Sequence, residues 1–140
     1  MSFGDIYDIA GSAMTAQTVR LNTVASNMAN VDVTAGSAAE AYRARRPVFS
    51  TIMGNTAHGG LATAKVNIRG IEESQAPLTR RYEPKNPQAD KDGYVFVSNV
   101  NIVEEMADMM AASRSFETNV DVLSRVRSMQ QGILRLGNPA

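Results

Sequence analysis

The chain has 140 residues, enough for one domain or for one compact part with a helical extension. Its 14 basic and 14 acidic side chains leave no net charge, which argues against a general affinity for nucleic acid or acidic membranes. The absence of cysteine excludes disulfides, thiolate catalysis and thiolate metal sites. No apolar run reaches the length of a transmembrane segment, and the acidic N-terminus is unlike a secretory signal peptide.

Residues 2–29 predict a first long helix. Ser2 is a suitable N-cap, and Asp5 stands at the third helical position. Apolar residues then recur in steps of three and four, with Gln17 as the one polar member. Gly11 costs about 1 kcal/mol of helix propensity, and we interpret it either as a point of close helix approach or as an accident of sequence. The predicted seam of this helix is Ile6, Ala10, Ala13, Leu21, Val24 and Met28.

The middle of the chain changes to β-type patterns. Residues 30–40 lose the period and collect turn-forming residues, which predicts a linker. Residues 40–71 predict an antiparallel hairpin, with a loop at 55–60 and with Pro47 at an edge or a bulge. Three prolines indicate an irregular connector at 72–92, and 93–97 predict a short strand.

The last long segment, 99–136, predicts the helix around which the chain is organised. Asn101 is its expected N-cap, with Glu104 reaching back as in a capping box. Glu104, Glu105 and Asp108 would then lie at the positive end of the helix dipole. Gly137, with Pro139 after it, signals the end of the helix.

This second helix is apolar on two faces. The predicted seam, with polar interruptions at Ser113, Arg127 and Gln130, is Ile102, Met106, Met109, Phe116, Val120, Leu123 and Leu134. A second face begins halfway along and comprises Val122, Val126, Met129, Ile133 and Leu136. Because a helix with two apolar faces is packed on two sides, we expect the first helix on the seam and copies of the same chain on the second face.

These elements predict an α+β fold that is mainly α. We expect the two terminal helices to pair in antiparallel fashion as a coiled coil, which places both termini at one end. The corresponding division is a discontinuous helical domain of residues 1–32 and 98–140, and a small β-rich module with an extended connector at 33–97.

No pattern for catalysis, cofactor binding or metal binding stands out. A hydrolase would have to use His58, the one histidine, which lies in a glycine-rich loop. The QADKDG run starting at Gln88 resembles a calcium loop but lacks its first and last ligands. The basic residues Arg43, Arg45 and Arg46 are best interpreted as solvated strand residues or as salt bridges to a neighbouring subunit.

Three blocks resemble a known family. They are ASNMAN at 25–30, YRARRPVF at 42–49, and DGYVFVSNVNIVEEMADMMAASRSFETNV at 92–120. The chain resembles the axial proteins of the bacterial flagellum, specifically the basal-body rod proteins, and most closely their short proximal-rod members. The first block carries the family signature residues Ser26, Asn27 and Asn30. Met28 stands where the signature usually has leucine, a change that conserves volume.

The resemblance implies a structural protein rather than an enzyme. Terminal helices of such proteins form the inner coiled-coil layer, called D0, that lines an export channel. Subunits leave the cell unfolded through the flagellar type III export apparatus, without a cleaved signal peptide. They then assemble helically with themselves and other rod proteins in the periplasm, next to the inner-membrane ring and rod-adaptor proteins, and transmit torque.

Two other functions remain open at this point. A coiled-coil adaptor or chaperone of a secretion system would form a stable folded dimer, whereas a rod subunit would order its terminal helices only on assembly. Another short rod protein of the same family is the second alternative.

Overall fold

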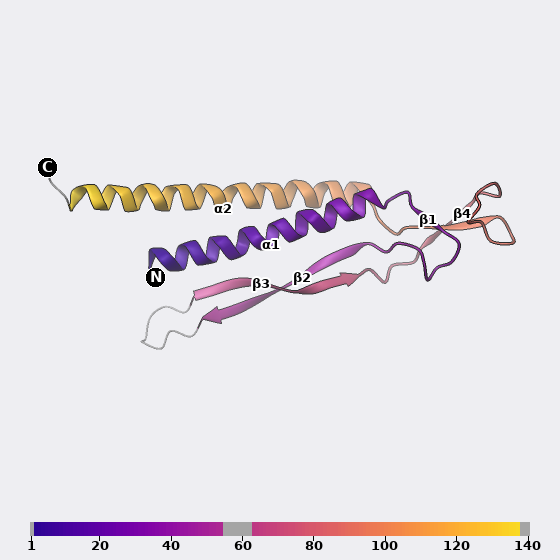
Figure 1. Ribbon diagram of the computed structural model, residues 1–140, viewed down its shortest axis with the longest axis horizontal. Coiled ribbons are helices and arrows are strands. Elements are labelled where there is room, and N and C mark those ends of the chain that lie inside the picture. Colours follow the sequence, from indigo (N-terminus) through magenta and orange to yellow (C-terminus); the bar gives the residue numbers. More distant parts are fainter. Residues whose placement is uncertain (1, 55–62, 138–140) are drawn as a thin grey trace.

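Two long antiparallel helices and a β-hairpin form three layers in the computed structural model, which describes residues 2–54 and 63–137 (Figure 1). Helix α1 spans Phe3–Ala29, and helix α2 spans Ile102–Leu136. Helix α1 starts and helix α2 ends at the same end of the molecule, as predicted, and α2 extends beyond the start of α1. The α+β class with paired terminal helices is therefore confirmed.

Helix α1 begins at a complete capping box. The Asp5 N–H donates to Ser2 Oγ at 3.2 Å, and the Ser2 N–H donates to the Asp5 carboxylate at 2.6 Å. The helix lies between α2 on one side and the hairpin on the other. Within the chain, α1 is thus the helix that is packed on two sides, whereas the sequence assigned that position to α2.

Helix α2 begins at Asn101, whose side-chain oxygen accepts the Val103 N–H at 3.1 Å. The predicted capping box is wrong in one detail. Glu104 accepts a hydrogen bond from the Asn101 side-chain amide at 3.2 Å, instead of from its backbone N–H. The helix ends at Leu136, with Gly137 as C-cap, where the sequence places the stop.

The predicted hairpin is formed by β2 (Arg45–Gly54) and β3 (Thr63–Glu73). Their register shifts between Val48 and Phe49, next to Pro47, which confirms that the proline stands beside a bulge. The hairpin is fastened to the first half of α1. Lys65 pairs with Asp8 at 2.7 Å, and the Val66 N–H donates to Ser12 Oγ at 3.1 Å.

A small antiparallel sheet occupies the end of the molecule away from the termini (Figure 1). Its strands, in the spatial order β1-β5-β4, are β1 (Thr34–Ala35), β5 (Tyr94–Val97) and β4 (Thr79–Tyr82). Only β5 was predicted. Strand β1 has two residues and β4 is exposed throughout, so neither contains an alternating apolar pattern.

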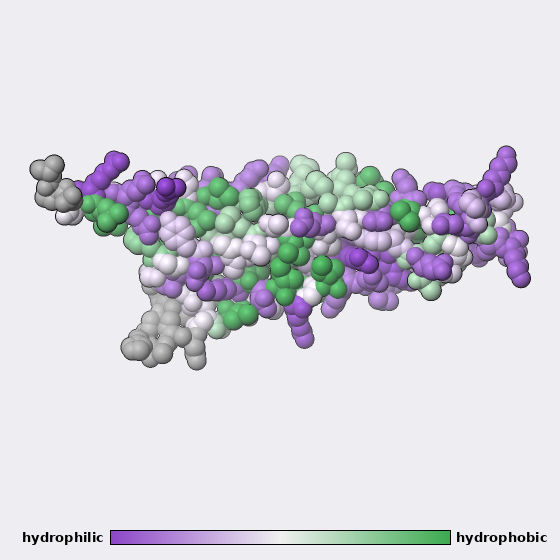
Figure 2. All heavy atoms as spheres, in the orientation of Figure 1, coloured by the Kyte–Doolittle hydropathy of each residue, from purple (hydrophilic) through white to green (hydrophobic). Residues whose placement is uncertain are grey.

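The core of the described chain is small. Its nine buried hydrophobic residues are six alanines and three valines, whereas eighteen large hydrophobic residues are exposed. Figure 2 shows apolar side chains gathered over α2 and the middle of the molecule, while the end with the three-stranded sheet is mainly hydrophilic. Neither helix among the described residues is long and apolar enough to cross a membrane. Large apolar groups therefore face outward, along the length of the helix pair.

Gly11 does not mark a close helix contact. A Cβ atom built at this residue would meet no atom within 4 Å among those described, other than the helix's own neighbouring backbone. Within the chain, the interpretation of Gly11 as a point of close approach is wrong.

Candidate functional site

The signature residue Asn27 lies where α1, α2 and the hairpin meet, and its side chain is 1% exposed. Its Nδ2 donates to the Arg45 carbonyl at 2.8 Å and to Glu105 Oε2 at 3.0 Å. Its Oδ1 accepts the Arg45 N–H and the Tyr42 hydroxyl, both at 2.9 Å. Two donors and two acceptor positions are thus all used, and one side chain holds three segments together. We call Asn27, Tyr42, Arg45 and Glu105 the polar junction.

The other two signature residues support the polar junction from α1. Ser26 Oγ lies 3.2 Å from the Tyr42 hydroxyl, which itself donates to Asn27. Asn30 is the C-cap of α1, and its Nδ2 donates to the Ser26 carbonyl at 2.7 Å. The three signature residues therefore fix the end of α1 and the segment that follows it.

Glu105 supplies the α2 side of the polar junction. The sequence placed it with the dipole-facing acids, but its side chain is 2% exposed and accepts from Asn27. Its second oxygen lies 3.9 Å from the guanidinium of Arg46. A buried carboxylate requires such compensation, because removing it from water without partners costs several kcal/mol.

Ion pairs extend the polar junction along the two helices. Arg20 of α1 pairs with Asp108 of α2 at 2.8 Å, and Arg46 of β2 reaches Asp108 at 3.2 Å and Glu104 at 3.3 Å. Each of these side chains is partly exposed, so each pair adds at most about 1 kcal/mol. Together they place opposite charges on facing surfaces of α1, β2 and α2.

The connecting segments around the polar junction are also held by side chains. Asn99 accepts the Ala44 N–H at 2.7 Å and donates to the Ala76 carbonyl at 2.9 Å. Ser98 is buried and donates to the Val31 carbonyl at 2.7 Å. The chain therefore enters α2 along a defined path.

The basic segment has partners within the chain. Arg43 donates to the Ser74 and Ala76 carbonyls, and Arg45 pairs with Glu73 at 3.2 Å. Arg46 pairs with acids of α2, and both Arg45 and Arg46 remain exposed on strand β2, as expected for solvated strand residues. Salt bridges to a neighbouring subunit stay a prediction.

The predicted seam of α1 lies inside the three-layer arrangement. Its members are all buried or half-buried: Ile6, Ala10, Ala13, Leu21, Val24 and Met28. Gln17 is also half-buried, and its Oε1 has no hydrogen-bond partner among the described residues. Their contribution to assembly stays a prediction.

The face of α2 that packs in the molecule differs from the predicted seam. Five seam positions are buried or half-buried as expected, namely Met109, Ser113, Phe116, Leu123 and Gln130. At every second seam position from Met106 to Arg127, the most deeply buried residue is the one immediately before the residue that was predicted. The packed face, which we call the inner stripe, is Glu105, Met109, Ala112, Phe116, Asn119, Leu123, Val126 and Gln130. Ile102, Met106, Val120 and Leu134 are exposed, so their predicted place in the intramolecular seam is wrong.

The second predicted face is mostly exposed. Val122, Met129, Ile133 and Leu136 face outward, and Leu136 is 85% exposed. Val126 is the exception, since it is 3% exposed and belongs to the inner stripe. Gln130, a polar interruption of the predicted seam, accepts a hydrogen bond from the Tyr7 hydroxyl of α1 at 3.1 Å. This contact marks the far end of the helix pair.

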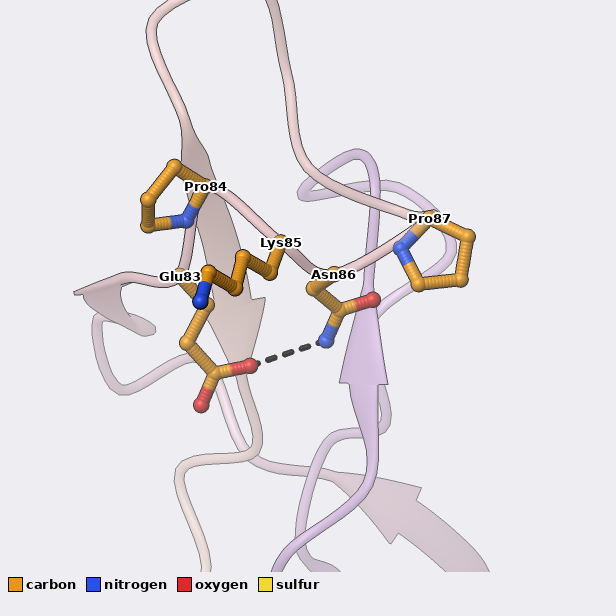
Figure 3. Close-up of a pocket in the computed structure, with 5 residues that line it drawn as sticks. All are labelled: Glu83, Pro84, Lys85, Asn86 and Pro87. Atoms are coloured by element: carbon orange, nitrogen blue, oxygen red, sulfur yellow. Dashed lines mark hydrogen bonds between the residues drawn. The ribbon is translucent and has the colours of Figure 1, made fainter.

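No arrangement for chemistry was found in the described part of the chain. It contains no group of three or more metal-binding side chains, and His58 lies outside the described residues. A shallow hollow of about 640 Å³ is lined by the single turn 83–87, where Asn86 donates to Glu83 at 2.8 Å (Figure 3). Because all its lining residues come from one turn, it brings no groups together from different elements.

Among the described residues, three carboxylates have a shifted pKa, and each belongs to a cap or a turn. The Ser2 backbone N–H lowers the pKa of Asp5, and the Asn86 amide lowers that of Glu83. The Tyr94 N–H is the main cause of the lowered pKa of Asp90. A lowered pKa keeps a carboxylate ionised near neutral pH, which suits a structural acceptor better than a proton-transfer group.

Sequence reasoning found Asn27 only through the family signature and missed its partners. Tyr42, Arg45 and Glu105 come from three separate segments, and Glu105 lies 78 residues from Asn27. One signal was present in the spacing, since Glu105 precedes Met109 by four residues and so continues an apolar row.

Comparison with known proteins gives consistent matches along the chain. Residues 8–36 match the family described as "Flagella basal body rod protein", and residues 91–136 match "Flagellar basal body rod FlgEFG protein C-terminal". The chain is 48% identical to the flagellar basal-body rod protein FlgC of Escherichia coli O6:H1, over 98% of this chain and 99% of that protein. The FlgC proteins of Salmonella typhimurium LT2 and Borreliella burgdorferi are 47% and 32% identical, with 98% and 92% of this chain covered and 99% and 93% of the relatives.

Proposed function

The chain belongs to the family of flagellar basal-body rod proteins, which makes it a structural subunit of that rod, and we propose that its place is the proximal rod. There, copies assemble helically with one another and with other rod proteins, form a drive shaft and enclose the export channel. The similarity to FlgC proteins along nearly the whole chain supports this assignment.

The observation that carries the proposal is the distribution of apolar residues. Among the described residues, ten of the eighteen exposed large hydrophobic side chains lie on α2, whereas no buried hydrophobic residue is larger than valine. Burying one such side chain contributes about 1.5–3 kcal/mol. A chain that leaves this many outside gains more from packing against neighbours than from its own core.

We propose different roles for the two sides of α2. The inner stripe packs on α1 of the same chain. The outer residues Val122, Met129, Ile133 and Leu136, joined by Met106, Val120 and Leu134, pack against neighbouring subunits. The last turn of α2 extends beyond α1, so its apolar side chains have no covering element within the described chain (Figure 1). The helical layer of residues 1–32 and 98–140 is then the inner, D0-type layer of the rod.

This function requires stiffness and no catalytic group. Apolar burial at about 25 cal/mol per Å², repeated along helices of some 50 Å around a tube, resists bending and twisting. The polar junction adds torsional coupling, because it joins both helices to the hairpin through directional hydrogen bonds. Torque entering at one layer is thereby transmitted to the other.

The proposal includes partners and a location. The rod lies in the periplasm, next to the inner-membrane ring and rod-adaptor proteins, and its subunits arrive through the type III export apparatus without signal-peptide cleavage. The zero net charge fits a subunit held by apolar packing and argues against nucleic acid as a partner.

The inner stripe is tested by Leu123→Asp and Phe116→Asp, with the exposed position Ser128→Asp as the matched control. We expect both stripe variants to be synthesised but to give no rods and no swimming, because a charge cannot remain in the helix interface. Immunoblots, electron microscopy of basal bodies and swimming assays measure this. Normal swimming by either stripe variant would contradict the proposal.

The outer face is tested separately with Ile133→Asp. This side chain is exposed in the chain, so the variant should match the parent in helix content while failing to build rods. Circular dichroism and protease digestion of the purified chain supply a second criterion. A rod subunit should be only partly helical and protease-sensitive at micromolar concentration, and a stable, protease-resistant dimer would favour the adaptor alternative.

A further inference from the structure

Helix α2 contains two competing packing faces that differ by a rotation about the helix axis. Both share Met109, Phe116, Leu123 and Gln130. The inner stripe completes this row with Glu105, Ala112, Asn119 and Val126, whereas the alternative completes it with Met106, Ser113, Val120 and Arg127. Successive residues lie about 100° apart around a helix, so the two faces differ by a rotation of roughly 50°.

Hydrophobicity alone does not favour the observed face. The half of α2 nearest the polar junction buries Glu105 and leaves Met106 exposed, and further along it half-buries Asn119 and leaves Val120 exposed. A rotation that buried Met106 and Val120 would cover two exposed apolar side chains and leave a carboxylate in solvent, but it would also turn Val126 outward and bring Arg127 inward. Apolar burial alone therefore does not decide between the two faces, which leaves room for a polar contact to select the observed rotation.

We propose that the hydrogen bond between Asn27 and Glu105 sets the rotation of α2 about its axis. The two side chains are the polar groups most deeply buried among those described, and their contact of 3.0 Å is directional. Asn27 is itself held by the Arg45 backbone and the Tyr42 hydroxyl, so it presents a fixed donor to α2. Buried polar residues that select one arrangement of paired helices are known to act in this way at some cost in stability.

The rotation determines which apolar residues reach the outside. In the observed setting Met106 and Val120 are exposed, together with the end of the helix, and Val120 borders an open hollow beside Tyr7 of α1. In the rotated setting they would be covered and Val126 would turn outward. Their use as a subunit contact rests on the proposed function, whereas the rotation is a property of the chain alone.

The test uses the absence of natural cysteine. Single cysteines are placed at Val120, which is 44% exposed, and at Val126, which is 3% exposed. Both lie at least 15 residues, or more than about 20 Å, from Glu105, so they report the rotation of the helix and not a local change. The rate of maleimide modification is measured in the purified full-length chain, with trimethylamine N-oxide to favour the folded state.

With Glu105 in place, maleimide should modify the Val120→Cys variant fast and the Val126→Cys variant slowly. In Glu105→Met, which keeps the volume but removes the acceptor for Asn27, we expect position 120 to slow and position 126 to speed up, with the ratio of rates changing at least about tenfold. The unfolding midpoint should stay unchanged or rise, because an apolar residue replaces a buried carboxylate. Glu105→Gln retains an oxygen acceptor and should retain the parent ratio.

Glu104→Met is the matched control, since it removes a neighbouring exposed acid that does not contact Asn27. It should leave the ratio of the modification rates at positions 120 and 126 unchanged. An unchanged ratio in Glu105→Met would overturn the proposal, because packing alone would then set the rotation. Fast modification at both positions in Glu105→Met, with position 126 still protected when Glu105 is present, would also overturn it, since the contact would then hold the helices together instead of orienting one of them. Swimming assays address the proposed function and are independent of both outcomes.

Discussion

Replacing Asn27 with alanine removes four hydrogen bonds at once, and we expect it to be among the most destabilising single changes in the chain. The Arg45 N–H, the Arg45 carbonyl, the Tyr42 hydroxyl and the Glu105 carboxylate each lose a partner. A buried group left without a partner costs about 1–3 kcal/mol, and more when it is charged. Glu105 bears most of this cost because it is nearly inaccessible to water, whereas the Arg45 backbone and the half-buried Tyr42 can regain water in part.

The expected loss for Asn27→Ala is therefore about 3–5 kcal/mol, a large part of the stability of a typical domain. For a chain of this length the melting temperature should fall by roughly 10–20 °C. The assay is urea unfolding followed by circular dichroism at 222 nm, in trimethylamine N-oxide so that a folded baseline is reached.

The matched control for this prediction is Asn22→Ala, an exposed asparagine on the same helix. It should change stability by no more than about 0.5 kcal/mol. A loss below about 1 kcal/mol in Asn27→Ala would refute the reasoning, because it would show that water replaces the lost partners at the polar junction.

Three further predictions concern local features. Gly93 has φ +81°, and an added Cβ would lie 2.9 Å from the Tyr82 ring, so Gly93→Ala should lower the free energy of unfolding by about 1–3 kcal/mol in urea titrations. A Cβ at Gly11 would enter open space, so Gly11→Ala should raise the free energy of unfolding by about 1 kcal/mol. A lower free energy of unfolding would show that this space is filled. The Ser2 N–H lowers the pKa of Asp5 in the folded chain. The contribution of Asp5 to stability is therefore fully present above its unfolded pKa of about 3.9 and is lost as the pH falls through the lower folded pKa. Helix content at acid pH should depend less steeply on pH in Asp5→Asn, and an identical pH profile would contradict this assignment.

The sequence by itself predicted most of the secondary structure for reasons that are local. Capping residues, a three–four apolar spacing and the glycine at position 137 set the limits of α1 and α2, and alternation with Pro47 set the hairpin and its bulge. Strands β1 and β4 were missed, because their short segments become strands only by pairing with β5. Pairing between distant segments leaves no signal within so few residues.

The sequence also identified the family signature, but the tertiary structure decided what its residues contact. The apolar pattern of α2 fits two packing faces, and periodicity favoured the one with Met106 and Val120. The folded chain packs the other face, burying Glu105 against Asn27 and turning Val126 inward. The physical reason is that a side chain's hydrogen-bond partners are fixed only when segments far apart in the chain come together. Periodicity shows how apolar a helix face is. The direction in which that face points also depends on which buried polar groups can form hydrogen bonds with one another.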